Sequence, residues 1–420
     1  MASIDTFNVE HDGKSFAAYR KVVPLISNPD VLYLNSAFMP PSNLLVHDAF
    51  ARFSNEALYN PNPKAQWLAA AEETRALVGR YINAEPSTLS FTRDTTEGLG
   101  YFIRSIKFSP GDNVVILDTE HPNHVLGWLS LRSQGLEVRQ VPTTAEVDRT
   151  GQLTAANAAT FAPYVDERTK AIGLSSIMFH SGQWNDVEDI CDTYRPRGIH
   201  VLADLTQQVG FTHVDVQALG VSAAAFSLHK GLNCPTGFGV LYVNQQVLEE
   251  LNPEPPMTTF ASLADRRADF TVDVADPILL QNNARRFDHW NQNLSAVAAA
   301  KAHLTFYLDT MGPKKVESYL FSLGDALRDE CKQLRIKIIG PQSRKEHAPH
   351  LYILDINGEG WVNFMKENGV QISPYRLGIR VSFGFYNNLD DVKRLAKILR
   401  QGLQSGLRTQ TASGTASSRL

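Results

Sequence analysis

Short apolar runs recur along the chain between residues 88 and 243, and polar or amphipathic segments of helix length separate most of them. Strands joined by such segments are typical of βα units and of a mainly parallel sheet covered by helices on both faces. The link between the last two runs is too short for a crossover helix, so we expect one strand to run antiparallel. The predicted strands are Thr88–Phe91, Asn113–Leu117, Glu137–Val141, Ala171–Ser175, His200–Ala203, Ala223–Ser227 and Gly239–Val243.

The pattern changes on either side of this region. A short apolar run, Val31–Leu34, comes first, and a helix is expected to begin near Lys64, after two prolines. Beyond residue 243, the proline-rich stretch Asn252–Pro256 predicts a stiff connector, and a long alanine-rich helix is expected near Leu294–Leu308. We therefore predict four parts: an N-terminal arm (1–30), a large domain (31–290), a smaller C-terminal domain with its connecting helix (291–403) and a disordered tail (404–420).

The two ends of the chain carry targeting information. The N-terminus is polar and acidic without the apolar core of a secretory signal, and no apolar run reaches membrane-spanning length. The tail is rich in Ser, Thr, Gly and Gln and ends in Ser418-Arg419-Leu420, a conservative variant of the peroxisomal Ser-Lys-Leu signal. We expect a peroxisomal protein, or otherwise a cytoplasmic one.

Composition narrows the classes of function. With 420 residues, 43% of them hydrophobic, the chain is long enough to bury a large core. A net charge of -4 gives no electrostatic footprint for nucleic acid or an anionic membrane, so we expect neither as a partner. The three cysteines, Cys191, Cys234 and Cys331, are too widely spaced for a disulfide framework or a metal site, and we predict no metal.

The first candidate for chemistry is Lys230, where a buried strand ending at Ser227 opens into a turn rich in Gly, Asn and Pro. Desolvation at such a position lowers the pKa of a lysine and frees its amine as a nucleophile that can form a Schiff base. The alternative is an ordinary surface lysine at a strand end. Upstream, Asp204 closes another strand, where the chemistry of a parallel sheet is found. Its alternative role is to cap the next helix.

Together, an acid at a strand end and a distant Ser-x-His-Lys are the layout of a pyridoxal-phosphate (PLP) site. The matching motifs are Phe-Ser-x-His-Lys at Phe226–Lys230, Asp-x-x-Gln at Asp204–Gln207, Thr-Thr-Glu at Thr95–Glu97 and Glu-His at Glu120–His121. With these motifs, the chain from about Leu32 to Leu399 resembles the class V aminotransferase superfamily, which includes cysteine desulfurases, isopenicillin N epimerase-like proteins, C–S lyases and kynureninase. The resemblance implies an α/β protein of PLP fold type I, with a mainly parallel seven-stranded sheet in the large domain and a smaller α+β C-terminal domain.

The resemblance also implies the roles of the cofactor site. Lys230 would bind PLP and act as the base, Asp204 would support the pyridine nitrogen, and His121, with His124 as the alternative, would stack on the ring. The remaining implied cofactor contacts are Thr95, Thr96, Gln207, Ser227 and His229. A helix N-terminus at Thr95 suits a phosphate, although the same residues could form an ordinary capping box. Asp94 stands where the family usually has Gly, and its carboxylate beside a phosphate is unfavourable unless it turns away.

For the substrate, the resemblance implies that Arg380 binds the α-carboxylate, which suits the planar fork of its guanidinium. Asn35, Phe38 and Met39 lie in an opening loop that is expected to border the substrate, or else only to pack on the core. Asn291 is expected to reach the phosphate of a partner subunit, which implies a homodimer with shared active sites. Here the chain has Trp290-Asn291 in place of the family's Gly-Thr pair.

The branch of the family decides the reaction. Desulfurases carry a nucleophilic cysteine upstream of the substrate arginine, whereas this chain has no cysteine after Cys331, which makes persulfide chemistry unexpected. His229-Lys230 and the five-residue step to Pro235 resemble the epimerase and C–S lyase branch, while Met178–Gln183 resembles kynureninase. We therefore predict an enzyme that forms a Cα carbanion on a modified amino acid and acts as a lyase or epimerase. The alternatives are an aminotransferase, a kynureninase-like hydrolase or an inactive homologue that acts as a binding protein.

Overall fold

The computed structural model describes residues 16–143 and 153–409. Within these residues, a central sheet has the strand order β2-β8-β7-β6-β5-β3-β4. Its seven strands are β2 (Leu89–Thr92), β3 (Asn113–Leu117), β4 (Glu137–Val141), β5 (Thr169–Ser175), β6 (His200–Asp204), β7 (Ala223–Ser227) and β8 (Gly239–Val243). Only β8 runs against the others, because it is antiparallel to both β7 and β2. The α/β class, the mainly parallel sheet and the reversed strand are confirmed.

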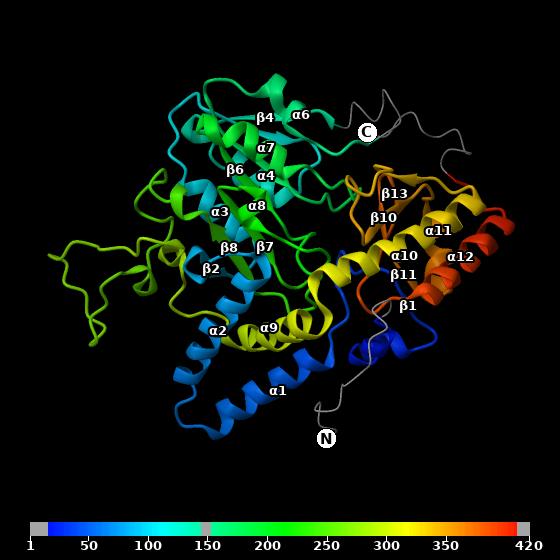
Figure 1. Ribbon diagram of the computed structural model, residues 1–420, viewed down its shortest axis with the longest axis horizontal. Helices are drawn as coiled ribbons and strands as arrows, with labels where there is room; N and C mark the ends of the chain where they lie inside the picture. The colour runs from blue at the N-terminus through cyan, green and yellow to red at the C-terminus, as the bar shows by residue number, and fades with distance from the viewer. Residues whose placement is uncertain (1–15, 144–152, 410–420) are drawn as a thin grey trace.

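Helices cover both faces of this sheet (Figure 1). Alternate residues of a strand point to opposite faces, and in β3 Val114 and Ile116 join one buried cluster while Val115 and Leu117 join the other. The first cluster includes residues of α3 (Thr95–Ser105) and α4 (Pro122–Leu129). The second includes residues of α2 (Lys64–Ile82), α6 (Ala158–Phe161), α7 (Val187–Tyr194) and α8 (Val216–Leu219).

Three long helices form a layer below the sheet in Figure 1: α1 (Leu44–Tyr59), α2 and α9 (Leu294–Phe306). Helix α9 packs on both α1 and α2. The sequence placed α9 in the connection to the C-terminal domain, and its packing instead joins it to the helices that precede the sheet. A π-helical turn, Tyr307–Met311, then leads into α10 (Pro313–Leu334).

The C-terminal part of the described chain contains a four-stranded antiparallel sheet of order β12-β13-β10-β9. Its strands are β9 (Ile338–Ile339), β10 (Leu351–Leu354), β12 (Ser373–Tyr375) and β13 (Gly378–Ser382), and its further helices are α11 (Glu359–Glu367) and α12 (Leu389–Gln404). An N-terminal strand, β1 (Leu32–Tyr33), pairs in parallel with β11 (Val370–Gln371). The start of the predicted large domain therefore lies against the C-terminal part, and Arg20 pairs with Asp391 on α12.

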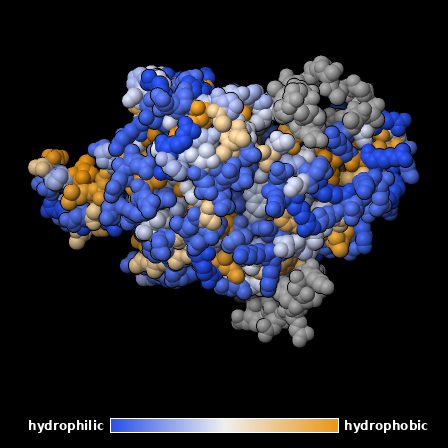
Figure 2. All heavy atoms as spheres, turned by 45° about the horizontal axis from the view of Figure 1, so that its top comes forward, coloured by the Kyte–Doolittle hydropathy of each residue, from blue (hydrophilic) through white to orange (hydrophobic). Residues whose placement is uncertain are grey.

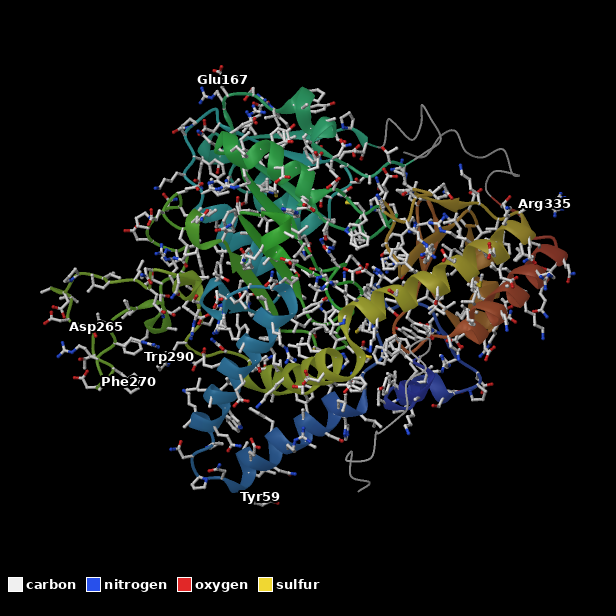
Figure 3. The ribbon with its side chains drawn as sticks, viewed as in Figure 1. Tyr59, Glu167, Asp265, Phe270, Trp290 and Arg335 are labelled. Atoms are coloured by element: carbon white, nitrogen blue, oxygen red, sulfur yellow. The ribbon has the colours of Figure 1, made fainter. Side chains whose placement is uncertain are left out.

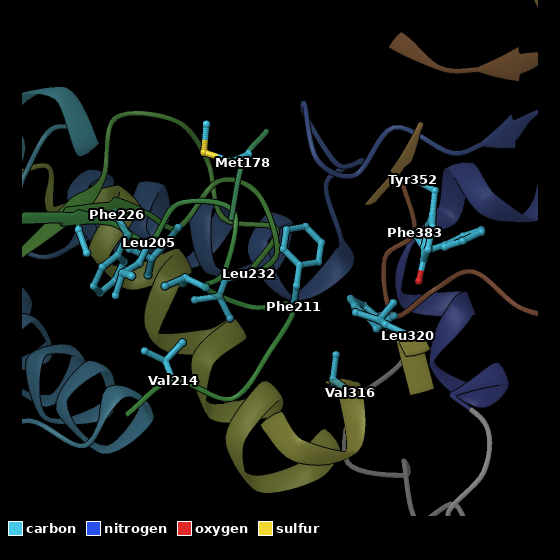
Figure 4. Close-up of a cluster of buried hydrophobic side chains, with 14 of the residues drawn as sticks. Met178, Leu205, Phe211, Val214, Phe226, Leu232, Val316, Leu320, Tyr352 and Phe383 are labelled. Carbon is cyan, nitrogen blue, oxygen red and sulfur yellow. The ribbon is translucent and has the colours of Figure 1, made fainter. Parts of the chain in front are cut away.

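Buried side chains connect the two sheets. Met178, Leu205 and Phe226 lie beside the large sheet, and the same cluster continues to Leu320 on α10 and Phe383 after β13 (Figure 4). Burial of apolar surface is the main stabilising term in folding. A shared core therefore fixes the C-terminal sheet against the carboxyl ends of the large sheet's strands.

The segment between β8 and α9 projects away from the sheet (Figure 1). Phe270, Asp265 and Trp290 lie on this projection (Figure 3), and the rings of Phe270 and Trp290 make an edge contact at 5.7 Å. Several of its apolar side chains, including Val274 and Ile278, are exposed, and apolar surface gathers there in Figure 2. No helix within residues 16–143 and 153–409 is both long and apolar enough to cross a membrane.

The predicted tail is described as far as residue 409. Gln404 ends α12, and the carbonyl of Arg408 accepts a hydrogen bond from Trp361 Nε1 at 2.8 Å. The expected targeting tripeptide, Ser418-Arg419-Leu420, lies outside the described residues, as does the first half of the predicted N-terminal arm, residues 1–15.

Candidate active site

A cavity of about 360 Å³ lies at the carboxyl ends of the parallel strands, where the C-terminal sheet closes over them. This is the expected position for a site in an open α/β sheet. Ten of the residues predicted from the sequence line it: Phe38, Thr95, Thr96, His121, Asp204, Gln207, Ser227, His229, Lys230 and Arg380.

Lys230 follows β7 and is held at the cavity by a close backbone contact. Gly210, with φ +84°, and Gly231 lie so near each other that a Cβ on Gly210 would be 2.2 Å from the carbonyl carbon of Gly231. Glycine at both positions lets the turn after Gln207 touch the turn after Lys230. Asp204 and Lys230, 26 positions apart in sequence, are thereby brought to one site.

The electrostatics of Lys230 match the expectation for a reactive amine. Its pKa is lowered from 10.5 to about 8, because burial and, to a smaller extent, the nearby Arg380 lower it more than Asp204 raises it. The alternative of an ordinary surface lysine does not fit, because Lys230 is partly buried and lines the cavity. Its neighbour His229 has a pKa lowered to about 4 by burial and by Lys230, so its imidazole is neutral at neutral pH.

At one end of the cavity, three hydroxyls meet at the first turn of α3. Thr95 Oγ1 lies 2.6 Å from Thr206 Oγ1 and 2.8 Å from Ser227 Oγ, and the Thr95 N–H donates to Ser227 Oγ at 2.9 Å. Hydroxyls and a helix N-terminus together favour an anion. Thr206 was not singled out from the sequence, although its place inside the Asp-x-x-Gln motif was a usable signal.

The position of the Asp94 side chain explains how the chain has a carboxylate where the family usually has Gly. It is the N-cap of α3, and its Oδ1 accepts a hydrogen bond from the Glu97 N–H at 2.8 Å. The carboxylate is thus turned back onto the helix, although the residue still lines the cavity. The capping role that the sequence offered as an alternative and the anion site therefore coexist in one turn.

Glu97 supports this turn from behind. It accepts hydrogen bonds from the Arg93 N–H at 2.7 Å and pairs with His289 Nε2 at 3.1 Å. Although burial acts to raise it, these bonds bring the pKa of Glu97 down to about 2. The carboxylate is therefore ionised, and it ties the segment before α9 to the first turn of α3.

The middle of the cavity holds His121, Asp204 and Gln207. The His121 ring caps α4 and meets Phe179 edge-on at 5.2 Å, and burial lowers its pKa. Asp204 Oδ1 accepts a hydrogen bond from the Thr206 N–H at 2.8 Å. The alternative role of Asp204, capping the next helix, is therefore reduced to a hydrogen bond within a local turn. Gln207 Nε2 donates to the Ala37 carbonyl at 2.9 Å, which joins the N-terminal loop to the site.

His124, the alternative to His121, lies outside this lining. It is fully buried, 3.7 Å from Glu120 and stacked near Trp128. Glu120 in turn accepts hydrogen bonds from the N–H and hydroxyl of Ser175. This pair therefore supports the loop that carries His121 rather than facing the cavity.

Arg380, on β13, occupies the opposite end of the cavity and is only 1% exposed. Its Nη1 donates to the Phe179 carbonyl at 2.7 Å, and its guanidinium lies 4.7 Å from the centre of the Tyr375 ring. Neither Nε nor Nη2 has a hydrogen-bond partner among the described residues. Burial lowers its pKa to about 10, so the group stays charged at neutral pH. Two buried, charged donors without partners favour an anionic ligand here.

Three predicted residues, Asn35, Met39 and Asn291, are not among the described residues that line the cavity. Asn35 Oδ1 accepts a hydrogen bond from Ser373 Oγ at 2.8 Å, and the Asn35 backbone forms a bridge with Ser382 of β13. Its neighbours Ala37 and Phe38 line the cavity. Asn291 is exposed next to Asn293, which caps α9. The sequence did not single out Phe179 and Tyr375 as site residues, because only the fold brings their segments to Arg380.

All three cysteines lie in the described part of the chain, and each is buried outside the cavity lining. The described residues contain no group of three His, Cys, Asp or Glu side chains arranged to hold a metal ion. The reactive groups gathered in this cavity are an amine with a lowered pKa, a carboxylate, neutral imidazoles and a guanidinium.

Comparison with known proteins agrees with this geometry. Residues 46–395 match the family model for class V aminotransferases. The chain is similar to an uncharacterized aminotransferase of Schizosaccharomyces pombe, with 48% identity over 388 residues that cover 92% of this chain and 96% of that protein.

Two solved proteins share the fold. A cysteine desulfurase from Thermococcus onnurineus has a TM-score of 0.79 at 20% identity, covering 96% of this chain and all of that one. The C–S lyase C-DES, in a mutant with glycine covalently linked to its PLP cofactor, has a TM-score of 0.79 at 19% identity, covering 90% of this chain and 98% of that one. The same lyase, which acts on cystine, is also known with its product cysteine persulfide.

Proposed function

The chain belongs to the class V aminotransferase family of PLP-dependent enzymes, and from this premise we propose that it removes the α-proton of an amino acid and then eliminates a side-chain substituent or inverts Cα. The proposal rests on one observation, that two reactive groups line the same cavity. A lysine with a pKa near 8 and a buried arginine with two unpaired donors both line it.

The residues of the cavity fit PLP. The hydroxyls of Thr95, Thr206 and Ser227 at the start of α3 suit its phosphate, and the Asp204 carboxylate suits a protonated pyridine nitrogen. Lys230 supplies the amine for a Schiff base, and His121 supplies a ring to stack on. When bound, the cofactor delocalises the electron pair left on Cα after deprotonation.

The protein's own groups would carry out the remaining work. Arg380 Nε and Nη2 would bind the α-carboxylate and so orient the Cα–H bond. Lys230 Nζ would take the α-proton, a role that its lowered pKa suits near neutral pH. Asp204 lies close enough to Lys230 to raise its pKa, and it would hold a proton on the ring nitrogen.

Two observations favour elimination or epimerisation, the first over persulfide transfer and the second over transamination. No cysteine lines the cavity within the described residues, which deprives a desulfurase mechanism of its nucleophile. His229 precedes the lysine, as is typical of the non-transaminating branch. The chain shares its fold with a C–S lyase, so the fold is compatible with β-elimination. In that reaction a thiol leaves as the Cβ–S bond breaks.

Product analysis tests this proposal. The holoenzyme would be incubated with S-substituted cysteines and with a panel of L-amino acids. Elimination gives ammonia, pyruvate and a thiol in equal amounts, and epimerisation gives the D-amino acid on chiral chromatography. A 2-oxo acid formed without ammonia, with the amino group left on the cofactor, would make the enzyme an aminotransferase. No product from any amino acid, with cofactor bound, would favour the inactive homologue.

We also propose a homodimer with shared sites, supported by the exposed position of Asn291 next to α9. Mixing Lys230→Ala with Asn291→Ala subunits would test it. Partial recovery of activity in the hybrid is expected if Asn291 acts across the interface. A monomer in analytical ultracentrifugation would contradict the proposal.

Peroxisomal targeting through Ser418-Arg419-Leu420 is proposed on the sequence alone. An N-terminal fluorescent fusion would be expected to enter peroxisomes, and deletion of the three residues would be expected to leave it in the cytosol. Equal distribution of both fusions would contradict the signal.

A further inference from the structure

Two aromatic rings stand beside Arg380 at the end of the cavity away from α3. The Phe179 and Tyr375 rings meet at 5.8 Å and 71°, and Phe179 also contacts His121. Both rings line the cavity and are only partly buried. They come from different elements, since Phe179 follows β5 and Tyr375 ends β12. The fold has therefore assembled an apolar wall within the same cavity as the substrate-binding arginine.

The other groups at this end are apolar as well. Ala37, Phe38 and Ile177 complete this part of the lining, and Phe38 is 56% exposed. Apart from Arg380 and Tyr375, the ionisable groups of the lining have roles elsewhere in the site. His121, Asp204, His229 and Lys230 are assigned to the cofactor, and Asp94 caps α3. The Tyr375 hydroxyl is the exception to the apolar character of the wall.

The unpaired donors of Arg380 limit the number of anionic groups that a substrate can place at this end. With Nη1 bound to the Phe179 carbonyl, Nε and Nη2 remain, and together they match one carboxylate. Arg380 is the only Lys or Arg among the residues that line this end, so a second anionic group on the substrate would find no further cation in the described lining. It would instead lose hydration against the rings, which is costly for a charge without a partner.

We propose that Phe179 and Tyr375 form the subsite for the substrate's side chain and that this subsite selects uncharged, apolar side chains, thioethers included. This rests on the proposed function, because it takes Arg380 to hold the α-carboxylate. The rings gain from covering apolar surface, and sulfur also contacts aromatic rings favourably. The main-chain carbonyl of Phe179 and the ring of Tyr375 additionally hold the guanidinium in place.

Leucine, asparagine and aspartate test the selection, since their side chains have similar size and shape and differ in polarity and charge. Their dissociation constants would be measured from the change that each causes in the visible absorption of the PLP-loaded enzyme. We expect leucine to bind at least about tenfold more tightly than aspartate, with asparagine between them. Exchange of the α-proton in D₂O would be recorded in parallel.

Phe179→Ser removes one ring while keeping the main-chain carbonyl that binds Arg380. It should reduce the ratio of the aspartate to the leucine dissociation constant by about fivefold or more, mainly through weaker leucine binding. Phe321→Ser is the matched control, because Phe321 lies under Arg344 at 5.3 Å on α10, outside the cavity lining. It should leave the ratio unchanged.

The outcomes separate this inference from the proposed function. Aspartate binding as tightly as leucine, with α-proton exchange intact, would overturn the apolar subsite and leave the proposed function standing. An unchanged ratio in Phe179→Ser would also overturn it. If none of the three amino acids changes the spectrum or exchanges its α-proton, both the proposed function and the inference fail.

Discussion

The two ends of the cavity differ in how their polar groups are partnered. At the end beside α3, the hydroxyls of Thr95, Thr206 and Ser227 bond to one another, and Asp94 bonds to the helix. At the other end, Arg380 is buried yet has two donors without partners among the described residues. The first end is held in position by its own network, and the second keeps its binding groups available.

This difference fits the two things that the site must do. A group that stays bound through many turnovers is served by a rigid, preformed cradle, because no ordering cost recurs. A substrate that enters and leaves is served by a buried, charged donor pair that no described protein group occupies, and by an apolar wall. Lys230 lies between the two ends and would act in both.

Removing the group between the two ends should have the largest effect. Lys230→Ala should lower the rate of α-proton exchange by at least about 10³-fold, since a positioned base contributes about 10²–10⁴. The visible absorption of the lysine-bound cofactor should also disappear. Lys301→Ala, which removes a surface lysine paired with Glu73, is the control and should change neither. Retained absorption at the same wavelength in Lys230→Ala would show that another lysine binds the cofactor.

Varying the pH isolates the same amine in the cofactor-free protein. The pKa of Lys230 is lowered from 10.5 to about 8, so the neutral amine should increase about tenfold per pH unit up to pH 8 and then level off. The rate of PLP capture should therefore rise about 10²-fold from pH 6 to 8. Pyridoxamine phosphate, which cannot form the Schiff base, corrects for changes in phosphate binding. A rate that keeps rising to pH 10 would contradict the lowered pKa.

Arg380→Ala should impair the substrate end of the cavity and leave the cofactor end unchanged. Loss of a buried charged donor should lower kcat/KM by about 10²-fold, while cofactor absorption stays intact. Arg380→Lys should recover only part of the loss, because an ammonium lacks the planar pair of donors. A variant that loses its cofactor instead would mean that the two ends are not independent.

Tyr375 should give the smallest effect. Tyr375→Leu removes the ring that lies 4.7 Å from the Arg380 guanidinium, and KM should rise about 2- to 30-fold with little change in kcat. Tyr375→Phe keeps the ring face and should stay close to the wild-type KM. An equal rise in both variants would assign the effect to the hydroxyl and not to the ring.

The end beside α3 was predicted well from the sequence, since strand ends and helix starts carry local signals. Asp204 and Ser227 end β6 and β7, Lys230 follows β7 and Thr95 begins α3, and parallel strands bring such positions to one edge. The predicted strands of the large sheet agree with the observed ones to within two residues at each end, because apolar runs that turns interrupt mark most of them.

The substrate end was only partly predictable, because its residues meet through the tertiary fold. Phe179 and Arg380 are 201 residues apart, and the periodicity around neither indicates the other. Asn35 shows the same limit, because its loop reaches the cavity through Ala37 and Phe38 while its own side chain bonds to Ser373. The apolar run of β1 likewise gave no sign that its partner would be β11.

The most direct test of the account is α-proton exchange with leucine in D₂O, followed by NMR in wild type and Arg380→Ala, each loaded with PLP. We predict exchange in the wild type and a loss of about 10²-fold in Arg380→Ala, although both proteins show the same cofactor absorption. Equal exchange in the two proteins would contradict the division of the cavity into a cofactor end and a substrate end.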